Sequence, residues 1–216
     1  MAKKTWGYGL LAPDLPADED LTPCSVETIA EDQAYERVLI RGQRTSGTID
    51  RLTIAESRLD QVAWPEAKLP EVLLRDVQGS TCDFSNAQMP GGEFQQVELV
   101  GAKLIGIDFT DAAWRNVVLT RCNLSFCTWR GAKLKNVRFE DCELGDADFY
   151  LVQFESVEWI DCRLRRSRFY GARFTETKMT RCDLLDLGAA ADDLRKLKMD
   201  AAGWLQLAPL FDVTID

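Results

Sequence analysis

A large apolar side chain returns at every fifth residue through most of this 216-residue chain. The series runs from Ile49 to Leu184, and of its 28 positions only Gly79 lacks such a side chain. A small or medium uncharged residue, such as Ala67 or Val97, stands two residues before each large one. A period of five matches neither an α-helix, which repeats every 3.6 residues, nor a flat strand, which alternates every two. The chain must therefore turn a corner every five residues.

The same residue type recurs more regularly at intervals of twenty residues than at intervals of five. One small position reads Cys82, Ala102, Cys122, Cys142, Cys162 and Cys182, and one large position reads Leu104, Leu124, Leu144, Leu164 and Leu184. Four five-residue units thus make one closed coil, and like residues stack on like. The pattern predicts an all-β solenoid of square cross-section with about seven coils of 20 residues. We expect Trp64 or Phe84 to fill the gap that Gly79 leaves in its column.

Composition argues against catalysis and against a metal or cofactor site. The chain has no histidine, which excludes Ser-His-Asp and Cys-His nucleophiles and histidine-containing metal sites. Six of the seven cysteines fall in small inward positions, and a straight column of thiols cannot supply the tetrahedron that zinc prefers. A rod filled by leucine and phenylalanine also lacks the water-excluding cleft that paired carboxylates need. We expect no catalytic residue, metal, cofactor or small-molecule substrate.

The chain shows no membrane span and no apolar stretch typical of a signal peptide. Thiols placed as small core residues suit a reducing cytoplasm. The formal net charge of −9 disfavours direct binding of nucleic acid. The sequence therefore predicts a cytoplasmic protein whose partners are proteins.

Three segments follow from where the period begins and ends. Residues 1–34, with prolines and the acidic run Asp18-Glu19-Asp20, predict an irregular arm. Residues 35–186 predict the β-helix, and residues 187–216 a C-terminal cap. Asp200 is placed to N-cap a short helix that Pro209 kinks or ends. This tail is more apolar than a cap requires, so we expect a symmetric homodimer through Trp204, Leu207, Leu210 and Phe211.

Charged residues twenty apart lie one above the other in such a stack. Twelve of these pairs have opposite signs, for example Asp146 with Arg166, and three have like signs, among them Asp141 with Asp161. Opposite charges on neighbouring strands stabilise a sheet. We therefore expect most surface charge to hold coils together, including that of the arginine cluster Arg163, Arg165, Arg166, Arg168 and Arg173.

The repeats resemble those of the pentapeptide-repeat family, whose consensus is roughly Ala-Asp/Asn-Leu-x-x. The resemblance rests on Arg130-Gly131-Ala132-Lys133-Leu134, Tyr170-Gly171-Ala172-Arg173-Phe174, Cys122-Asn123-Leu124, Ala147-Asp148-Phe149 and Cys182-Asp183-Leu184. It covers residues 47–186 and implies a right-handed quadrilateral β-helix. The uninterrupted stack and helical tail are similar to the fluoroquinolone-resistance members, which implies a dimeric mimic of duplex DNA that binds gyrase.

Two functions remain open from the sequence. The first is a DNA-mimicking protein that binds DNA gyrase or another type II topoisomerase and modulates it or protects it from a poison. The best local candidate for that contact is an acidic patch of six residues: Glu140, Asp141, Glu143, Asp146, Asp148 and Asp161. The alternative is a non-enzymatic structural scaffold for another protein partner, which the N-terminal arm favours.

Overall fold

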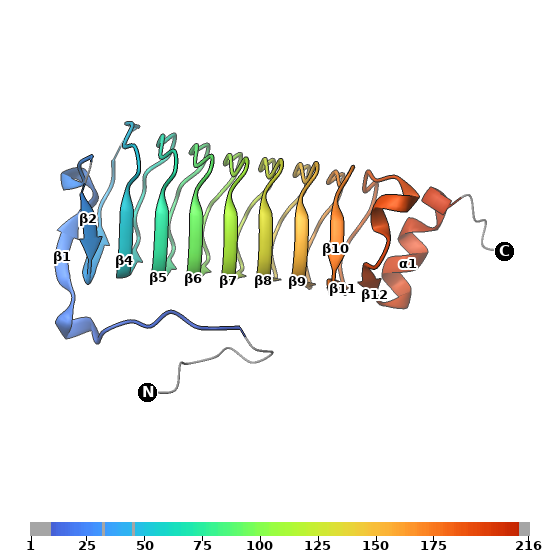
Figure 1. Ribbon diagram of the computed structural model, residues 1–216, viewed down its shortest axis with the longest axis horizontal. Coiled ribbons are helices and arrows are strands. Elements are labelled where there is room, and N and C mark those ends of the chain that lie inside the picture. Colours follow the sequence, from blue (N-terminus) through green and yellow to red (C-terminus); the bar gives the residue numbers. More distant parts are fainter. Residues whose placement is uncertain (1–9, 32, 45, 212–216) are drawn as a thin grey trace.

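The five-residue period becomes a rod whose backbone turns four corners in each coil. In the computed structural model, which describes residues 10–31, 33–44 and 46–211, every fifth residue from Arg51 to Asp186 has a φ between 47° and 70°. These left-handed residues are the corners, and the straight segments between them form the four faces. The fold is a right-handed quadrilateral β-helix (Figure 1), as the sequence predicts.

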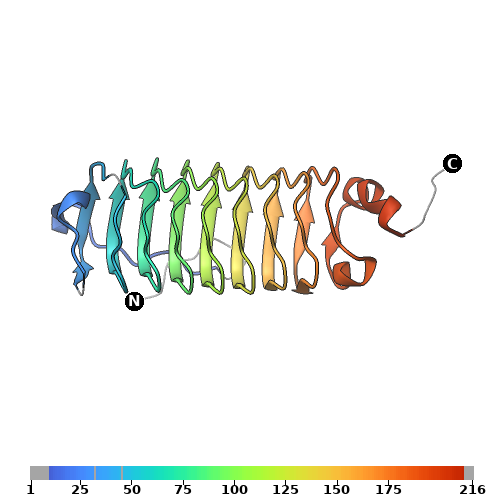
Figure 2. The same cartoon turned by 90° about the horizontal axis from the view of Figure 1, so that it is seen from above.

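All strands pair in parallel within one twelve-stranded sheet. From β4 to β9 the partners are twenty residues apart, as in Val77, Val97 and Val117, which confirms the predicted coil length. Isolated bridges such as Asp83 with Lys103 repeat this register on the other faces. Figure 2 shows the coils in one straight, unbranched row. The strands are β1 (Thr22–Ser25), β2 (Ala34–Glu36), β3 (Val38–Arg41), β4 (Thr53–Asp60), β5 (Leu73–Ser80), β6 (Glu93–Val100), β7 (Ala113–Thr120), β8 (Lys133–Glu140), β9 (Gln153–Ile160), β10 (Arg173–Thr175), β11 (Lys178–Thr180) and β12 (Lys198–Met199).

An aromatic stack fills the middle and the C-terminal half of the rod. Phe149 lies against Phe169 with ring centroids 4.6 Å apart, and against Trp129 at 5.9 Å. Such ring pairs stabilise a core beyond the area that they bury. The stack comprises Phe94, Phe109, Trp114, Trp129, Phe139, Phe149, Phe154, Trp159, Phe169 and Phe174.

The N-terminal half of the core is packed less tightly. An apolar void of about 40 Å³ lies among residues that include Trp64, Phe84 and Leu99. The gap at Gly79 is filled by Leu99 of the next coil, whose Cδ2 atom lies 2.6 Å from where a Cβ atom would stand. The prediction that Trp64 or Phe84 fills it is wrong, because the nearest side chain comes from the residue stacked directly above.

The small inward positions are buried, as predicted for the cysteine column. Cys122, Cys142 and Cys162 are each almost fully buried, and their thiols donate to main-chain carbonyls, as Cys162 does to Ile160 at 3.3 Å. All seven cysteines are free thiols. These residues act as small core side chains.

The solenoid has about nine turns, more than the seven coils expected, because both ends continue it without the twenty-residue period. At the N-terminal end, Thr22 of β1 pairs with Val38, and Leu39 pairs with Arg58. The paired residues in these coils are fewer than twenty positions apart in the sequence. A twenty-residue repeat in the sequence therefore does not include these strands. Paired strands thus begin within the segment expected to be irregular, which also holds the 3-10 turns η1 (Asp18–Asp20) and η2 (Val26–Thr28).

At the C-terminal end, a further partial turn closes the rod before the helix. Leu194, the last residue of the 3-10 turn η3 (Ala191–Leu194), is buried in the core, and so are Leu187 before the turn and Leu197 after it. The helix α1 (Ala201–Leu207) follows and continues into the 3-10 turn η4 (Ala208–Phe211). The predicted N-cap is confirmed, because the Asp200 side chain accepts a hydrogen bond from the Gly203 amide at 2.8 Å.

The N-terminal arm lies along the rod rather than projecting from it (Figure 1). The Gln96 side chain donates to the Ala12 carbonyl at 3.2 Å, and the Asp14 amide donates to the Asp76 carboxylate at 2.9 Å. Further along, Asp18 forms an ion pair with Arg58 at 2.9 Å. The arm therefore crosses β6, β5 and β4 in turn, running back against the direction in which the coils stack.

Candidate functional site

The stacked opposite charges form ion pairs between neighbouring coils. In one example, two nitrogens of the Arg166 guanidinium donate hydrogen bonds to the two carboxylate oxygens of Asp146, at 2.8 and 2.7 Å. Ion pairs join residues twenty apart in Asp83–Lys103, Lys135–Glu155, Arg138–Glu158, Glu143–Arg163, Asp146–Arg166, Asp148–Arg168 and Asp161–Arg181. The prediction that surface charge links the coils is confirmed at these positions.

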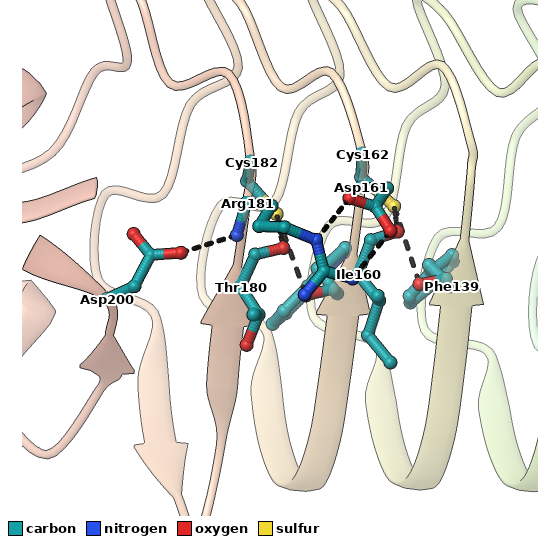
Figure 3. A network of polar contacts seen from close by, with 9 residues as sticks. Phe139, Ile160, Asp161, Cys162, Thr180, Arg181, Cys182 and Asp200 are labelled. Carbon is teal, nitrogen blue, oxygen red and sulfur yellow. Dashed lines mark hydrogen bonds and ion pairs between the residues drawn. The ribbon is translucent and has the colours of Figure 1, made fainter. Parts of the chain in front are cut away.

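One such pair continues into the C-terminal cap (Figure 3). Arg181 donates to both carboxylate oxygens of Asp161, at 2.6 and 2.7 Å, and its own amide donates to Asp200 at 2.6 Å. The hydrogen bond and charge of Arg181 hold the pKa of Asp161 below its usual range. The Arg181 and Gly203 amides likewise lower the pKa of Asp200. Asp200 therefore ties the start of α1 to the last full coil.

The arginine cluster is matched by carboxylates, as expected. Arg163, Arg166 and Arg168 pair with acids one coil earlier, and Arg165 pairs with Asp183 at 2.5 Å. Arg173 has no ion pair among the residues that the structure describes. The cluster that resembles a nucleic-acid patch in the linear sequence is thus largely neutralised in the stack.

The same pairing covers most of the predicted acidic patch. Glu143, Asp146 and Asp161 each face an arginine of the next coil. Asp148 is buried and lies between Arg130 at 2.7 Å and Arg168 at 3.5 Å. Glu140 and Asp141 are exposed and have no ion pair within the described part of the chain. The six residues of the patch lie on neighbouring coils. Among them, only Glu140 and Asp141 have no ion pair with a cation in the described part of the chain.

Exposed acidic residues gather instead at the N-terminal end. Residues 10–80 contain 14 Asp and Glu against 7 Lys and Arg, so this third of the chain carries −7 of the net −9. Asp14, Glu19 and Asp20 of the arm are exposed, and the arm lies beside Asp76. The acidic run was visible in the sequence, but nothing in the repeat pattern indicated that it lies along the rod. We call Asp14, Asp18, Glu19, Asp20 and Asp76 the acidic arm site.

The C-terminal tail presents an apolar surface around α1. Trp204 is 40% exposed and Leu205 57% exposed, and the Trp204 and Phe211 rings lie 6.0 Å apart. Leu207 is buried against the rod, and Leu210 also packs on the core. Of the four residues predicted to form a dimer contact, Trp204 and Phe211 face outward, whereas Leu207 closes the end of the chain's own core.

Neither a metal centre nor a spanning helix is found in the described residues. No group of three or more His, Cys, Asp or Glu side chains there is placed to hold a metal ion. No helix in that part of the chain is long and apolar enough to cross a membrane.

Comparisons with known proteins agree with the coil geometry. A family model described as a pentapeptide repeat region matches residues 93–159, and one described as pentapeptide repeats (8 copies) matches residues 147–184. The rod is thus a repeat solenoid built from five-residue units. The chain is a pentapeptide-repeat protein.

No curated protein matches the sequence. Among solved structures, the chain is similar to trypsin-treated QnrB1, a plasmid-mediated fluoroquinolone resistance protein. That match has 14% identity, covers 84% of this chain and 99% of that chain, and has a TM-score of 0.46. The chain is also similar to HetL from the cyanobacterium Nostoc sp. strain PCC 7120, a pentapeptide-repeat protein involved in heterocyst differentiation regulation. Here the identity is 13%, the coverage 78% and 87%, and the TM-score 0.34.

Proposed function

We propose that this protein mimics duplex DNA and binds a type II topoisomerase such as DNA gyrase, which it modulates or protects from a poison. The observation that carries the proposal is the acidic arm site, in which the exposed residues Asp14, Glu19 and Asp20 lie along the outside of a straight rod. The resemblance of the repeats to those of topoisomerase-binding pentapeptide proteins supports this partner.

The dimensions of the rod suit a groove that binds DNA. The sheet path from β1 to β12 contains ten strands, which at about 4.8 Å per spacing gives a length of about 43 Å. One turn of duplex DNA is about 34–36 Å long. A rigid rod therefore offers its partner a continuous surface slightly longer than one DNA turn.

Charge supplies the attraction in this proposal. The carboxylates of Glu19 and Asp20 are exposed, so they are available to the lysine and arginine side chains of a DNA-binding groove. Binding between complementary exposed charges weakens as salt screens them. Glu140 and Asp141, the unmatched part of the predicted patch, extend the proposed contact along the rod.

The experiment titrates the full chain into a gyrase supercoiling reaction at low and high ionic strength. We expect inhibition, or protection from a poison, that weakens steeply at high salt. The variant Glu19→Gln/Asp20→Asn removes two arm charges without touching the Asp18–Arg58 pair. We expect it to need several-fold more protein for the same effect.

A matched control removes two carboxylates elsewhere. Asp111 and Asp186 are corner residues with positive φ, and asparagine tolerates that conformation. Asp111→Asn/Asp186→Asn should keep the wild-type effect. Equal loss in both double variants would show that only net charge matters, and the absence of any effect of the wild-type chain would refute the proposed partner.

We also propose that two copies of the chain associate in the cytoplasm through the exposed face of α1. Trp204, Leu205 and Phe211 form an apolar surface at one end of the rod, and a two-fold contact is the common way to cover such a surface. Sedimentation of Trp204→Glu/Phe211→Glu tests this. The variant should remain folded, because Leu207 still closes the core, and should shift from dimer to monomer. A wild-type monomer at micromolar concentration would contradict the proposal.

A further inference from the structure

A second surface, on the C-terminal half of the rod, combines exposed aromatic side chains with unpaired cations. It consists of the corner residue Leu151 with Tyr150 and Tyr170, each of which directly precedes a corner, and of an adjoining groove across β6–β10. We call Tyr150, Leu151 and Tyr170 the tyrosine corner. We propose that this surface binds an acidic segment of a partner protein that also carries apolar side chains. The proposal does not depend on the topoisomerase function, because the acidic arm site lies on other coils.

The tyrosine corner is exposed and held in place. Tyr150 is 45% exposed and Tyr170 46% exposed, and the register places these residues one coil apart. The Arg130 guanidinium lies 5.9 Å from the centre of the Tyr150 ring and is itself fixed by its hydrogen bond to Asp148 at 2.7 Å. The Tyr170 ring lies over Gly188, where an added Cβ atom would stand 3.2 Å from it. Rigid aromatic side chains of this kind are typical anchors of protein interfaces.

Leu151 is an unusual residue for its position. Its φ is 60°, a conformation that costs a non-glycine residue about 1–3 kcal/mol. The same corner is glycine one coil before and one coil after, at Gly131 and Gly171. Leu151 is exposed, so its side chain does not add to the core. An exposed leucine at a corner where the neighbouring coils have glycine adds little to the core and is available to a partner.

The adjoining groove is open and positively charged. It has a volume of about 680 Å³. Within it, Lys135 pairs with Glu155 at 2.5 Å, and Glu93 accepts a hydrogen bond from Gln95. The remaining cations in the lining are Arg115, Lys133 and Arg173, which have no ion pair among the described residues. This contrasts with the other arginines of these coils, most of which face a carboxylate.

The position of the cations points to a ligand with spaced carboxylates. Arg115 lies directly beside Lys135 in the sheet register, and like charges opposite each other destabilise a sheet. Lys133 and Arg173 flank Gln153 on successive strands, so they are about 9.6 Å apart along the rod. In an extended peptide, residues three positions apart are separated by about 10 Å. One acidic residue in every three would therefore meet both cations.

The tyrosine corner and the groove lie on adjoining faces of the same coils. Arg173 follows Tyr170 by three residues, and Gln153 follows Tyr150 by three, with the corners at Gly171 and Leu151 between them. A protein segment fits this surface better than a nucleic acid does. Leu151 is 51% exposed next to Tyr150 in the chain, and its aliphatic side chain suits the apolar side chains of a protein segment rather than a phosphate backbone.

The test uses fluorescence anisotropy with a labelled peptide in which every third residue is glutamate and the residues between are leucine and phenylalanine. The control peptide carries glutamine at each glutamate. We expect the acidic peptide to bind the wild-type chain at least tenfold more tightly than the control peptide. We expect Lys133→Glu/Arg173→Glu and Tyr150→Ala/Tyr170→Ala each to weaken that binding at least tenfold.

A matched charge reversal on other faces, Lys68→Glu/Arg121→Glu, should leave the affinity unchanged, and thermal melts of every variant establish that it is folded. Three results would overturn the proposal. These are no measurable binding of the acidic peptide, binding that survives both groove and corner variants, and tighter binding of a single-stranded DNA oligonucleotide that the same variants abolish.

Discussion

The aromatic stack predicts that the rod is not equally tolerant of core truncation along its length. Phe149 is fully buried and lies between Trp129 and Phe169, at centroid distances of 5.9 and 4.6 Å. Phe84 lies outside the stack and borders the void of about 40 Å³. Replacing Phe149 by alanine removes ring contacts on both sides of the side chain. Replacing Phe84 by alanine removes fewer contacts, because this side chain already borders the void.

The magnitudes follow from measured truncations in other proteins. A buried Phe→Ala change costs about 3–5 kcal/mol. A side chain that borders a void has fewer packing contacts to lose when it is removed. In a chain of this length, one kcal/mol lowers the melting temperature by about 2–4 °C. We expect Phe149→Ala to lose about 6–20 °C and Phe84→Ala to lie at or below the lower end of that range.

The assay is thermal unfolding followed by far-UV circular dichroism, with urea unfolding as a second measure. Phe149→Leu serves as the control, because leucine occupies the equivalent large position on the neighbouring face, as at Leu144. This variant should lose much less stability than Phe149→Ala. Equal losses for Phe84→Ala and Phe149→Ala would refute the reasoning that the aromatic stack is the tighter half of the core.

Three further predictions concern the reactivity of the cysteine thiols, the stability of the protein in acid and the residue type at a corner. Burial raises the pKa of Cys182 to about 11, so a thiol reagent at neutral pH should label the half-buried Cys24 in the native protein and all seven cysteines only after denaturation. The pKa of Asp161 is lowered by Arg181, so its contribution to stability is present above the unfolded value of about 3.9 and is lost as the pH falls through the lower folded value. Asp161→Asn should therefore melt below the wild type near neutral pH and match it in strong acid. Phe126 is an exposed corner residue with a φ of 62°, and Phe126→Gly should raise or preserve the melting temperature; a clear drop would mean that the ring stabilises the coil.

The core of the fold was predictable because one period governs it. Large side chains at every fifth residue, from Ile49 to Leu184, require a corner every five residues, and repetition at twenty requires four corners in each coil. What the period did not show is the conformation of the corners. Glycine and asparagine, which favour a positive φ, occupy some corners, such as Gly131 and Asn136, but residues as different as Arg51 and Leu151 share that φ at others, so no single residue type marks the corners.

The ends were less predictable because their coils differ in length. Thr22 and Val38 pair although they are fewer than twenty residues apart, so the first turns have no signal in the period. The N-cap at Asp200 was predictable, because capping depends on local sequence alone.

In the candidate site, too, the contacts fixed by the repeat were predictable from the sequence, and the contacts between distant segments were not. Stacked charges such as Asp146 and Arg166 follow from the register, so their ion pairs were expected. A carboxylate that meets an arginine on the next coil is no longer free for a partner, so the same register leaves little of the predicted acidic patch available. The position of the arm depends on contacts between residues far apart in the sequence, such as Asp14 with Asp76, which no pattern in one sequence reveals.

Displacement of DNA from gyrase is the direct measure of whether this protein mimics duplex DNA. A fluorescently labelled DNA duplex bound to purified gyrase is titrated with the full chain, and its release is followed by anisotropy at low and high salt. We expect the protein to release the duplex in a dose-dependent manner and high salt to weaken that release. We expect Glu19→Gln/Asp20→Asn to require several-fold more protein for the same release. A duplex that stays bound at saturating protein, with gyrase and with other type II topoisomerases, would contradict DNA mimicry.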